Sequence, residues 1–331
     1  MSVYTSVSQA QLDDFLLNYD VGKCLGYRGI EAGVENTNYF VSTRKGEFVL
    51  TLYEELTHQQ LPFFLGLLDH LSAHQVATVT PVPRRDNSGF IGTLAGKPAA
   101  LVERLPGTNV MDVTDKHCAI IGSTIARMHL AGQSYPGNSC RSGHRDEAFA
   151  QINNEKVFSQ LSTDQQTLLR SELHYYAENT IDDMSKLPQG IIHADLFRDN
   201  CLFVQDEPPR LSGIIDFYYA NRDALLYDLA IIANDWCFDK QGQLDMVKHQ
   251  ALLQAYHASR PLTDLEICHW SDMLRASALY FWVYRLLFNL FPRQGETVAT
   301  KNAQEFQQKL EWHLQHLPEI QAVIDSLLEV V

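Results

Sequence analysis

The sequence predicts an α+β protein with a small β-rich N-terminal lobe and a larger, mostly helical C-terminal lobe. The chain has 331 residues, which is too long for one small core and typical of two lobes. Its first part contains β-branched and aromatic runs, whereas the chain after residue 112 mostly repeats its apolar residues at helical spacing. We expect the boundary at residue 103, with domains 1–103 and 104–331.

Strands around one helix make up the expected N-terminal lobe. Residues 29–43 and 46–55 are strand-like runs, and the Arg-Lys-Gly sequence at 44–46 is typical of a hairpin turn. Residues 61–74 form an apolar run of helical length. Residues 97–107 predict a further strand, which ends at a Pro-Gly break.

Helices dominate the expected C-terminal lobe. Residues 115–132 have apolar positions at helical spacing and end at a glycine, and 163–181 begins at the favourable N-cap sequence Thr163-Asp164. A short β segment at 190–217 interrupts the helices. The helical runs that follow it are 225–237, 247–259, 263–291 and 303–317.

Composition and charge narrow the possible partners. Hydrophobic residues make up 45% of the chain and charged residues 20%, as in ordinary globular proteins. Lys plus Arg is 26 and Asp plus Glu is 40, so the net charge is −14. Because such a chain repels phosphate backbones and anionic lipids, we expect neither nucleic acid nor membrane as a partner. The sequence does not predict an oligomeric state.

The N-terminus and the cysteines indicate the cellular compartment. The start of the chain lacks the basic and apolar segments of a signal peptide, and no apolar run approaches the ~18 residues of a membrane helix. None of the six cysteines lies within four residues of another, so no zinc-type spacing exists. We therefore expect a reduced, cytoplasmic protein.

The stretch GIIHADLFRDNCLF, residues 190–203, carries the predicted chemistry. It places several polar residues between two apolar flanks, where they could not all be buried without partners. His193, Asp195 and Asn200 fit the pattern H-x-D-x-x-x-x-N, and Asp216 ends the next apolar run. A polar turn capped by Asp and Asn side chains would explain the motif but not Asp216.

Phosphoryl transfer from ATP requires these residue types. One carboxylate orients the attacking hydroxyl and accepts its proton, while an amide oxygen and a second carboxylate hold Mg²⁺ against the phosphates. An Asp with an ordinary pKa of ~3.9 is a weak base towards an alcohol. Orientation and charge neutralisation should therefore supply most of the rate enhancement.

The chain resembles the aminoglycoside-phosphotransferase-like kinase superfamily, whose members have a protein-kinase-like two-lobed fold. Within it, HADLFRDN (193–200), IDFYYA (215–220) and YDLAIIANDWC (227–237) resemble the bacterial homoserine kinases. The other segments that carry the resemblance are ENTNYFV (35–41), GEFVLTLYE (46–54), LPFFLGLLDHL (61–71), GKPAALVERLPG (96–107) and LRASALYFWVYRL (274–286).

The resemblance implies roles for individual residues. Asp195 would be the catalytic base, and Asn200 and Asp216 would be the magnesium ligands. His193 would brace the catalytic loop with the help of Asp228.

For ATP, the resemblance implies a hinge and a phosphate loop. The backbone of Leu101 to Leu105, including Val102, Glu103 and Leu105, would bind the adenine. Asn36 and Asn38 would lie in the loop that joins the first two strands and covers the phosphates.

Thr51 departs from the kinase pattern. Kinases usually carry a Lys or Arg at this strand position to hold the α- and β-phosphates. Thr51 lies on the same strand face as Val49 but brings no charge. The cations that could replace the missing one are Arg28, Arg44, Lys45 and Arg198. Without a strand cation, Glu54 is interpreted as a surface charge.

A small amino-acid alcohol would need a cation for its carboxylate and an acid or carbonyl for its ammonium. Arg198 could bind the carboxylate, or it could be structural. Arg285, inside an apolar helix, is either paired in the core or directed into the cleft. Asp235 could meet the ammonium and Tyr219 could line the pocket, although core packing is the alternative for the aromatic residues.

These observations predict an ATP- and Mg²⁺-dependent kinase that phosphorylates the side-chain hydroxyl of L-homoserine to O-phospho-L-homoserine, on the route to threonine. One alternative is a kinase of another small alcohol, such as an aminoglycoside, choline or methylthioribose. Another is a kinase-like ATP-binding protein without turnover. Protein-kinase activity is less favoured, because no extended activation segment follows Asp216. Away from this site, we expect His129 to be a packed helix residue and His313 and His316 to be solvated.

Overall fold

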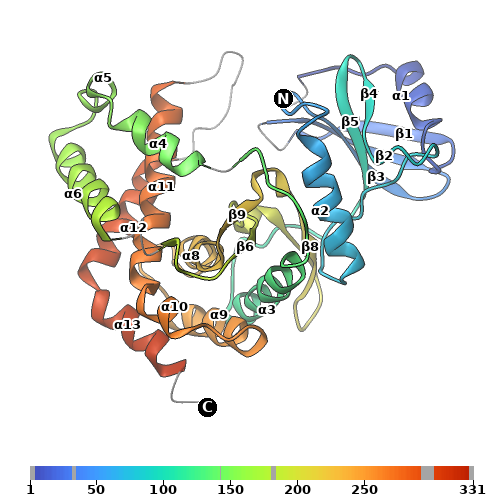
Figure 1. Ribbon diagram of the computed structural model, residues 1–331. Helices are drawn as coiled ribbons and strands as arrows, with labels where there is room; N and C mark the ends of the chain where they lie inside the picture. The colour runs from blue at the N-terminus through green and yellow to red at the C-terminus, as the bar shows by residue number, and fades with distance from the viewer. Residues whose placement is uncertain (1–3, 32–34, 142, 180–183, 292–301, 328–331) are drawn as a thin grey trace.

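The structure is a computed structural model that describes residues 4–31, 35–141, 143–179, 184–291 and 302–327. A small lobe built on one sheet lies beside a larger helical lobe (Figure 1). This arrangement confirms the α+β fold class that the sequence predicts. The boundary between the expected domains, at residue 103, stays a prediction.

The N-terminal lobe contains a five-stranded antiparallel sheet with the strand order β1-β2-β3-β5-β4. Its strands are β1 (Cys24–Gly29), β2 (Thr37–Thr43), β3 (Glu47–Leu52), β4 (Gly92–Leu94) and β5 (Lys97–Glu103). The expected hairpin turn joins β2 to β3, where the Thr43 amide donates to the Gly46 carbonyl at 2.9 Å. The run expected at 29–43 is too long for one strand, because β2 begins only at Thr37, and residues 32–34 lie outside the described residues.

The described part of this lobe contains two helices, whereas the sequence predicted only α2 (Leu61–Ala73). The additional helix is α1 (Gln9–Leu16), which begins at a capping box formed by Ser8 and Gln11. Leu12 of α1 packs with Tyr39, Val41 and other apolar residues of one sheet face. An eight-residue helix carries little periodic signal, so only its cap could have revealed it.

Helices form most of the C-terminal lobe, as expected. They are α3 (Asp115–Gly132), α4 (His144–Ile152), α5 (Glu155–Phe158), α6 (Thr163–Asn179), α8 (Leu225–Trp236), α9 (Met246–Ser259), α10 (Asp264–Cys268), α11 (Trp270–Leu290), α12 (Ala303–Gln315) and α13 (Leu317–Asp325). The single helix expected at 263–291 is divided at His269 into α10 and α11. The helix expected at 163–181 is described to Asn179, and residues 180–181 lie outside the described part.

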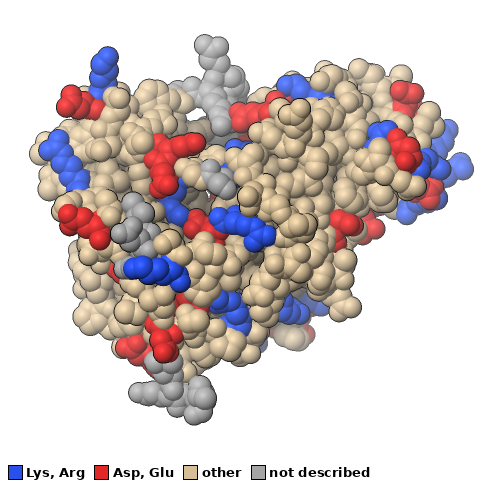
Figure 2. Space-filling view, viewed as in Figure 1, with Lys and Arg blue, Asp and Glu red and all other residues tan. Residues whose placement is uncertain are grey.

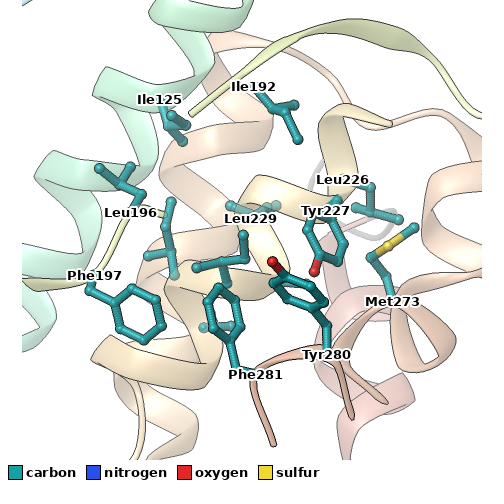
Figure 3. Close-up of a cluster of buried hydrophobic side chains, with 14 of the residues drawn as sticks. Ile125, Ile192, Leu196, Phe197, Leu226, Tyr227, Leu229, Met273, Tyr280 and Phe281 are labelled. Atoms are coloured by element: carbon teal, nitrogen blue, oxygen red, sulfur yellow. The ribbon is translucent and has the colours of Figure 1, made fainter. Parts of the chain in front are cut away.

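The helix α8 is the centre of the helical lobe, because all of its residues are buried. Figure 3 shows Leu226, Tyr227 and Leu229 of α8 beside Tyr280 and Phe281 of α11. The hydroxyl groups of Tyr227 and Tyr280 lie near each other in this view. This packing fixes α8 and α11 behind the polar loop described below.

Two short antiparallel strand pairs carry the polar motif of the sequence. The pairs are β6 (Gln189–Ile192) with β9 (Asn221–Ala224), and β7 (Cys201–Val204) with β8 (Arg210–Ile214). The apolar flanks of the motif are therefore strands, and the polar residues between them form a loop that ends in the short 3₁₀ helix η1 (Arg198–Asn200). A second such helix, η2 (Phe217–Tyr219), follows β8.

Hydrogen bonds join the two lobes along a line that we call the lobe seam, formed by Ala77 and Thr78 on one side and Gly213 and Ile214 on the other. The Ile214 amide donates to the Ala77 carbonyl at 2.9 Å, and Thr78 Oγ1 donates to the Ile214 carbonyl at 3.0 Å. A Cβ on Gly213 would lie 3.2 Å from the Ala77 carbonyl carbon, so the seam leaves little room for a side chain there. The lobes are thus connected at a second place besides the chain at 104–107.

Acidic and basic side chains are interspersed on the face that Figure 2 shows, and neither sign gathers into one large patch. Among the residues that the structure describes, no helix is both long enough and apolar enough to cross a membrane.

Candidate active site

The loop of residues 193–200 is held at its start by the carboxylate of Asp228. One oxygen of Asp228 accepts the His193 amide at 2.7 Å and the other accepts the Ala194 amide at 2.8 Å. Asp228 is fully buried in the first turn of α8. These two bonds hold Ala194 at a φ of +67°, a left-handed conformation that non-glycine residues rarely adopt.

A histidine from another helix completes the surroundings of Asp228. His129 Nε2 of α3 lies 3.1 Å from the same carboxylate, and His129 Nδ1 lies 2.8 Å from the Tyr256 hydroxyl. His129 is fully buried. The prediction that His129 is a packed helix residue is confirmed, and its position links α3 and α9 to the loop.

The ring of His193 braces the loop across to Asp216. Its Nδ1 accepts the Asp195 amide at 3.2 Å, which leaves Nε2 to donate to the Ile215 carbonyl at 2.9 Å. Burial lowers the pKa of His193, although nearby Asp228 opposes this effect. A neutral imidazole with both nitrogens occupied by backbone groups is suited to bracing.

Asp195, Asn200 and Asp216 come together at the end of this loop. Asn200 Nδ2 donates to the Asp195 carbonyl at 2.8 Å and to its Oδ2 at 3.3 Å. The Ile215 amide donates to the Asn200 carbonyl at 2.9 Å, which places Asp216 beside Asn200. The structure thus brings together the three residues on which the predicted phosphoryl transfer depends.

Arg198 and Asp235, both predicted to bind substrate, bind each other. Asp235 Oδ2 accepts the Arg198 amide at 2.7 Å and Arg198 Nε at 3.3 Å, and Asp235 Oδ1 accepts Nη2 at 3.2 Å. The pair neutralises its own charges and fixes the middle of the loop to the end of α8. Of the two alternatives for Arg198, the contacts support the structural one.

Arg285 is paired in the core rather than directed into the cleft. Its Nη1 donates to Glu305 Oε2 at 2.8 Å and to the Asn302 carbonyl at 2.9 Å, and its guanidinium lies 4.4 Å from the centre of the Phe306 ring. A buried arginine needs such partners, and here α12 and the residue before it supply them. The interpretation of Arg285 as a cleft residue is therefore not supported.

One face of the sheet is turned towards the helical lobe. Val102 and Ala100 of β5 belong to the main core together with residues of that lobe, and they pair with Val49 and Thr51 of β3. Thr51 Oγ1 donates to Asn38 Oδ1 at 2.8 Å. The expectation that Asn38 lies in the loop between the strands is wrong, because Asn38 belongs to β2 and pairs with Thr51.

The residues around this face offer few free charges. Of the four cations considered for the phosphates, Arg198 is paired with Asp235 and Lys45 with Asp20 at 2.6 Å. Arg44 is exposed. Arg28 lies 5.0 Å from the centre of the Phe40 ring and so remains on the cleft-facing side.

The backbone amides of the connection between the lobes are only partly paired among the described residues. The Glu103 amide donates to the Thr80 carbonyl at 2.9 Å, and the Arg104 amide donates to the Glu47 carbonyl at 3.0 Å. Within the described ranges, the Leu105 amide has no hydrogen-bond partner. Val102, three residues before Leu105, lies on the cleft-facing side of β5.

Sequence reasoning missed Arg141 and Glu35 and misplaced Glu54. Arg141 donates through Nε to the Tyr218 carbonyl at 3.1 Å, and no motif or periodicity marks it in the sequence. Glu54 is not a surface charge, because its side chain is 15% exposed and lies 3.1 Å from Lys97 Nζ. Tyr219 extends from η2, and its hydroxyl donates a hydrogen bond to Glu35. Sequence reasoning did not single out Glu35.

His313, expected to be solvated, is fully buried. It lies 2.6 Å from Asn234 Oδ1 of α8, and burial lowers its pKa to about 3. His316 is not simply solvated either, because its ring stacks on Trp312 at a centroid distance of 4.1 Å. The buried face of α12 is wider than the sequence suggested, because it includes His313 together with its hydrophobic neighbours.

Comparisons with known proteins agree with this geometry. The model of the phosphotransferase enzyme family, APH, matches residues 26–262. The homoserine kinase of Burkholderia lata is 42% identical over 97% of this chain and 99% of its own length. Among solved structures, the microcompartment-associated aminopropanol kinase superposes with a TM-score of 0.69 at 16% identity, covering 95% of this chain and 99% of its own.

A second solved structure, an amicoumacin kinase in complex with AMP-PNP, Ca²⁺ and Ami, has a TM-score of 0.65 and 17% identity. It covers 95% of this chain and 93% of its own. At these identities the two structures are similar to the chain in fold.

Proposed function

We propose the function of this chain from the premise that it belongs to the phosphotransferase enzyme family, in the group of the homoserine kinases. It transfers the γ-phosphoryl group of ATP to the side-chain hydroxyl of L-homoserine and forms O-phospho-L-homoserine, a step towards threonine. The observation that carries this proposal is that Asp195 and Asn200 of the braced loop lie together with Asp216, which follows β8, in a chain 42% identical to a homoserine kinase over 97% of its length.

Asp195 would act as the catalytic base. Its carboxylate is half-buried at the open end of the loop, and Asn200 Nδ2 lies 3.3 Å from one of its oxygens. A hydroxyl hydrogen-bonded to the same carboxylate would be oriented towards the γ-phosphorus and would pass its proton to Asp195 as the bond forms. Asp228 and His193 would serve this step by fixing the backbone on which Asp195 stands.

Asn200 and Asp216 fit a magnesium site. The amide nitrogen of Asn200 is occupied by Asp195, which leaves Oδ1 as a ligand oxygen, and Mg²⁺ prefers such oxygens together with phosphate and water. Within the described ranges, no group of three or more His, Cys, Asp or Glu could hold a metal by itself. When bound, the ion would supply positive charge against the phosphates, so we expect it to bind with ATP.

The nucleotide would lie between the cleft-facing side of the sheet and the catalytic loop. The unpaired Leu105 amide would donate to the adenine, with Val102 and Glu103 lining the same edge. Asn36, Asn38 and Thr51 would contribute neutral hydrogen-bonding groups near the phosphates. Because Thr51 brings no charge, the metal and backbone amides would carry more of the phosphate binding here than in kinases with a strand lysine.

A coupled assay of ADP release tests the proposed function. Purified protein with Mg-ATP would be offered homoserine, serine, threonine, choline, kanamycin and methylthioribose. We expect selective turnover of homoserine. Turnover of a different alcohol would keep the mechanism but contradict the substrate, and ATP binding without turnover on any alcohol would contradict the enzyme.

A further inference from the structure

Arg141 brings a cation to the metal side of the candidate active site. It lies in the chain between α3 and α4 and reaches back to η2, directly after Asp216. Its Nε donates to the Tyr218 carbonyl at 3.1 Å, and its guanidinium lies 4.8 Å from the centre of the Tyr219 ring. One backbone bond and one aromatic face therefore fix the direction of this side chain.

Among the described residues, the charge of Arg141 has no counter-ion. In the part of the chain that the structure describes, Arg141 forms no ion pair and its Nη1 and Nη2 donate no hydrogen bond. Other arginines of this lobe are different, since Arg145 pairs with Asp223 at 2.6 Å and Arg275 with Glu172 at 3.0 Å. Two parallel N–H groups on a fixed guanidinium match a carboxylate in bidentate fashion.

A carboxylate of the sheet lobe flanks the same aromatic residue. Glu35 accepts a hydrogen bond from the Tyr219 hydroxyl, while Arg141 lies over the ring of Tyr219. His144 is close to both charges: burial lowers the pKa of His144, Arg141 lowers it further, and Glu147 and Glu35 oppose this. A cation and an anion on two sides of one ring are complementary to the carboxylate and ammonium of an amino acid.

The same cluster reaches the proposed base. Burial raises the pKa of Tyr280, and among the nearby charges Asp195 raises it while Arg145 and Arg141 lower it. The hydrogen bonds give the same placement: Arg141 bonds the carbonyl of Tyr218, two residues after Asp216, and the neighbouring Ile215 amide donates to Asn200, whose side chain donates to Asp195. A short amino-acid alcohol could place its hydroxyl at Asp195 and its charged end at Arg141.

We propose that Arg141 binds the α-carboxylate of homoserine and that Glu35 meets its ammonium group. This proposal rests on the proposed function, because it takes homoserine as the acceptor. It moves the recognition of the amino acid away from Arg198 and Asp235, whose charges neutralise each other. Homoserine is then selected over alcohols that lack either charged group.

Alcohols that lack one charged group test the proposal. The variants Arg141→Gln and Glu35→Gln would be compared with the unmodified enzyme on homoserine, on 3-amino-1-propanol, which has no carboxylate, and on 4-hydroxybutyrate, which has no ammonium. For Arg141→Gln we expect kcat/KM for homoserine to fall about 10- to 100-fold, the cost of a lost charged hydrogen bond. With 3-amino-1-propanol the fall should be less than about threefold.

The variant Glu35→Gln should show the reciprocal pattern. Its kcat/KM should fall for homoserine and 3-amino-1-propanol but stay within about threefold for 4-hydroxybutyrate. Arg141→Lys, which keeps the charge without the planar fork, should recover part of the loss with homoserine.

A matched control separates binding from loosening of the segment before α4. Arg222 donates through Nε to the Gly137 carbonyl at 3.0 Å and through Nη2 to the Tyr135 carbonyl. Arg222→Gln should therefore loosen this segment and affect all three alcohols alike. If Arg141→Gln did the same, its role would be structural and the proposal would be wrong.

Two further outcomes would overturn the proposal. An Arg141→Gln variant with unchanged kinetics for homoserine would exclude carboxylate binding. A variant whose KM for ATP rises while its KM for homoserine stays the same would assign Arg141 to the phosphates. Failure of the unmodified enzyme to phosphorylate homoserine would instead contradict the proposed function, so the two failures are distinguishable.

Discussion

The catalytic loop and the cleft-facing side of the sheet differ in how their polar groups are held. In the loop, Asp228 and the ring of His193 satisfy four backbone groups within 3.2 Å and leave Asp195 in a fixed place. On the sheet, Thr51 and Asn38 share one hydrogen bond, and the cation that kinases usually place there is absent. The comparison teaches that this chain holds the charged groups of the loop at 193–200 in fixed places, whereas Thr51 and Asn38 present only neutral groups on the sheet.

The largest expected effect on turnover is that of replacing Asp195 in the catalytic loop. Asp195→Asn should keep the fold and ATP binding but lower kcat about 100- to 10,000-fold, because the amide cannot accept the hydroxyl proton. Single-turnover kinetics with Mg-ATP and homoserine would measure it. Asp199→Asn is the matched control, since Asp199 lies in the same loop but is exposed. If Asp195→Asn kept the turnover of the unmodified enzyme, the proposal that Asp195 is the catalytic base would be wrong.

The bracing carboxylate should come next. Asp228→Asn replaces one acceptor oxygen by a donor that faces the backbone amides of His193 and Ala194. We expect the free energy of unfolding to fall by about 1 to 3 kcal/mol and kcat to fall about 10- to 100-fold. Urea denaturation and initial rates would measure the two effects. The control is Asp245→Asn at the N-cap of α9, where asparagine caps equally well.

Buried histidines should make the stability of the helical lobe depend on pH. His249 and His313 of the helical lobe have pKa values lowered to about 3 by burial. Their unfolded values are about 6.5, so the unfolded state binds protons first. Stability should therefore be fully present above about pH 6.5 and should fall as the pH drops towards about 3.

Thermal melts across this pH range would measure that loss. His313→Gln, which keeps a hydrogen-bond donor for Asn234, should show a less steep fall on acidification than the unmodified protein. His58→Gln in the sheet lobe is the control, because His58 is exposed and its replacement should leave the slope unchanged. Equal slopes for all three proteins would contradict the assignment of this acid sensitivity to His313.

The smallest effect is expected on the sheet. Thr51→Val removes the hydrogen bond to Asn38 but no charge, so KM for ATP should rise only about two- to tenfold. Thr93→Val on β4 is exposed and serves as the control. A rise of several hundredfold in KM for ATP would show that Thr51 contributes as much to phosphate binding as a cation. It would contradict the view that the sheet binds the phosphates more weakly than the loop holds its charges.

The sequence predicted the catalytic loop because its residues are close together in the chain. His193, Asp195 and Asn200 lie within eight positions between two strands. Residues so near in the chain stay near each other however the two lobes are arranged, so their motif can be recognised from the sequence. The two-lobed fold was predictable for a similar reason, since strand-like and helical periodicities occupy separate parts of the chain.

The acceptor side could not be predicted in the same way. No motif or periodicity marks Arg141, and Glu35 begins a strand-like run without being singled out, so only the folded chain brings both to Tyr219. Arg285 was interpreted partly as a cleft residue because its partner Glu305 lies far along the chain. The sequence marks a charge in an apolar helix, but it does not say which distant carboxylate neutralises it.

The lobe seam has a consequence for engineering a new specificity. Ala77, Thr78 and Ile214 join the lobes through backbone and hydroxyl bonds that involve none of the residues proposed for the acceptor. The segment that carries Arg141 and the helix that carries Tyr280 therefore lie outside this connection. A library that varies Tyr280 and the residues around Arg141, and leaves the rest of the buried helix α11 and residues 77, 78, 213 and 214 untouched, should retain folded members, so directed evolution towards other alcohols should begin there.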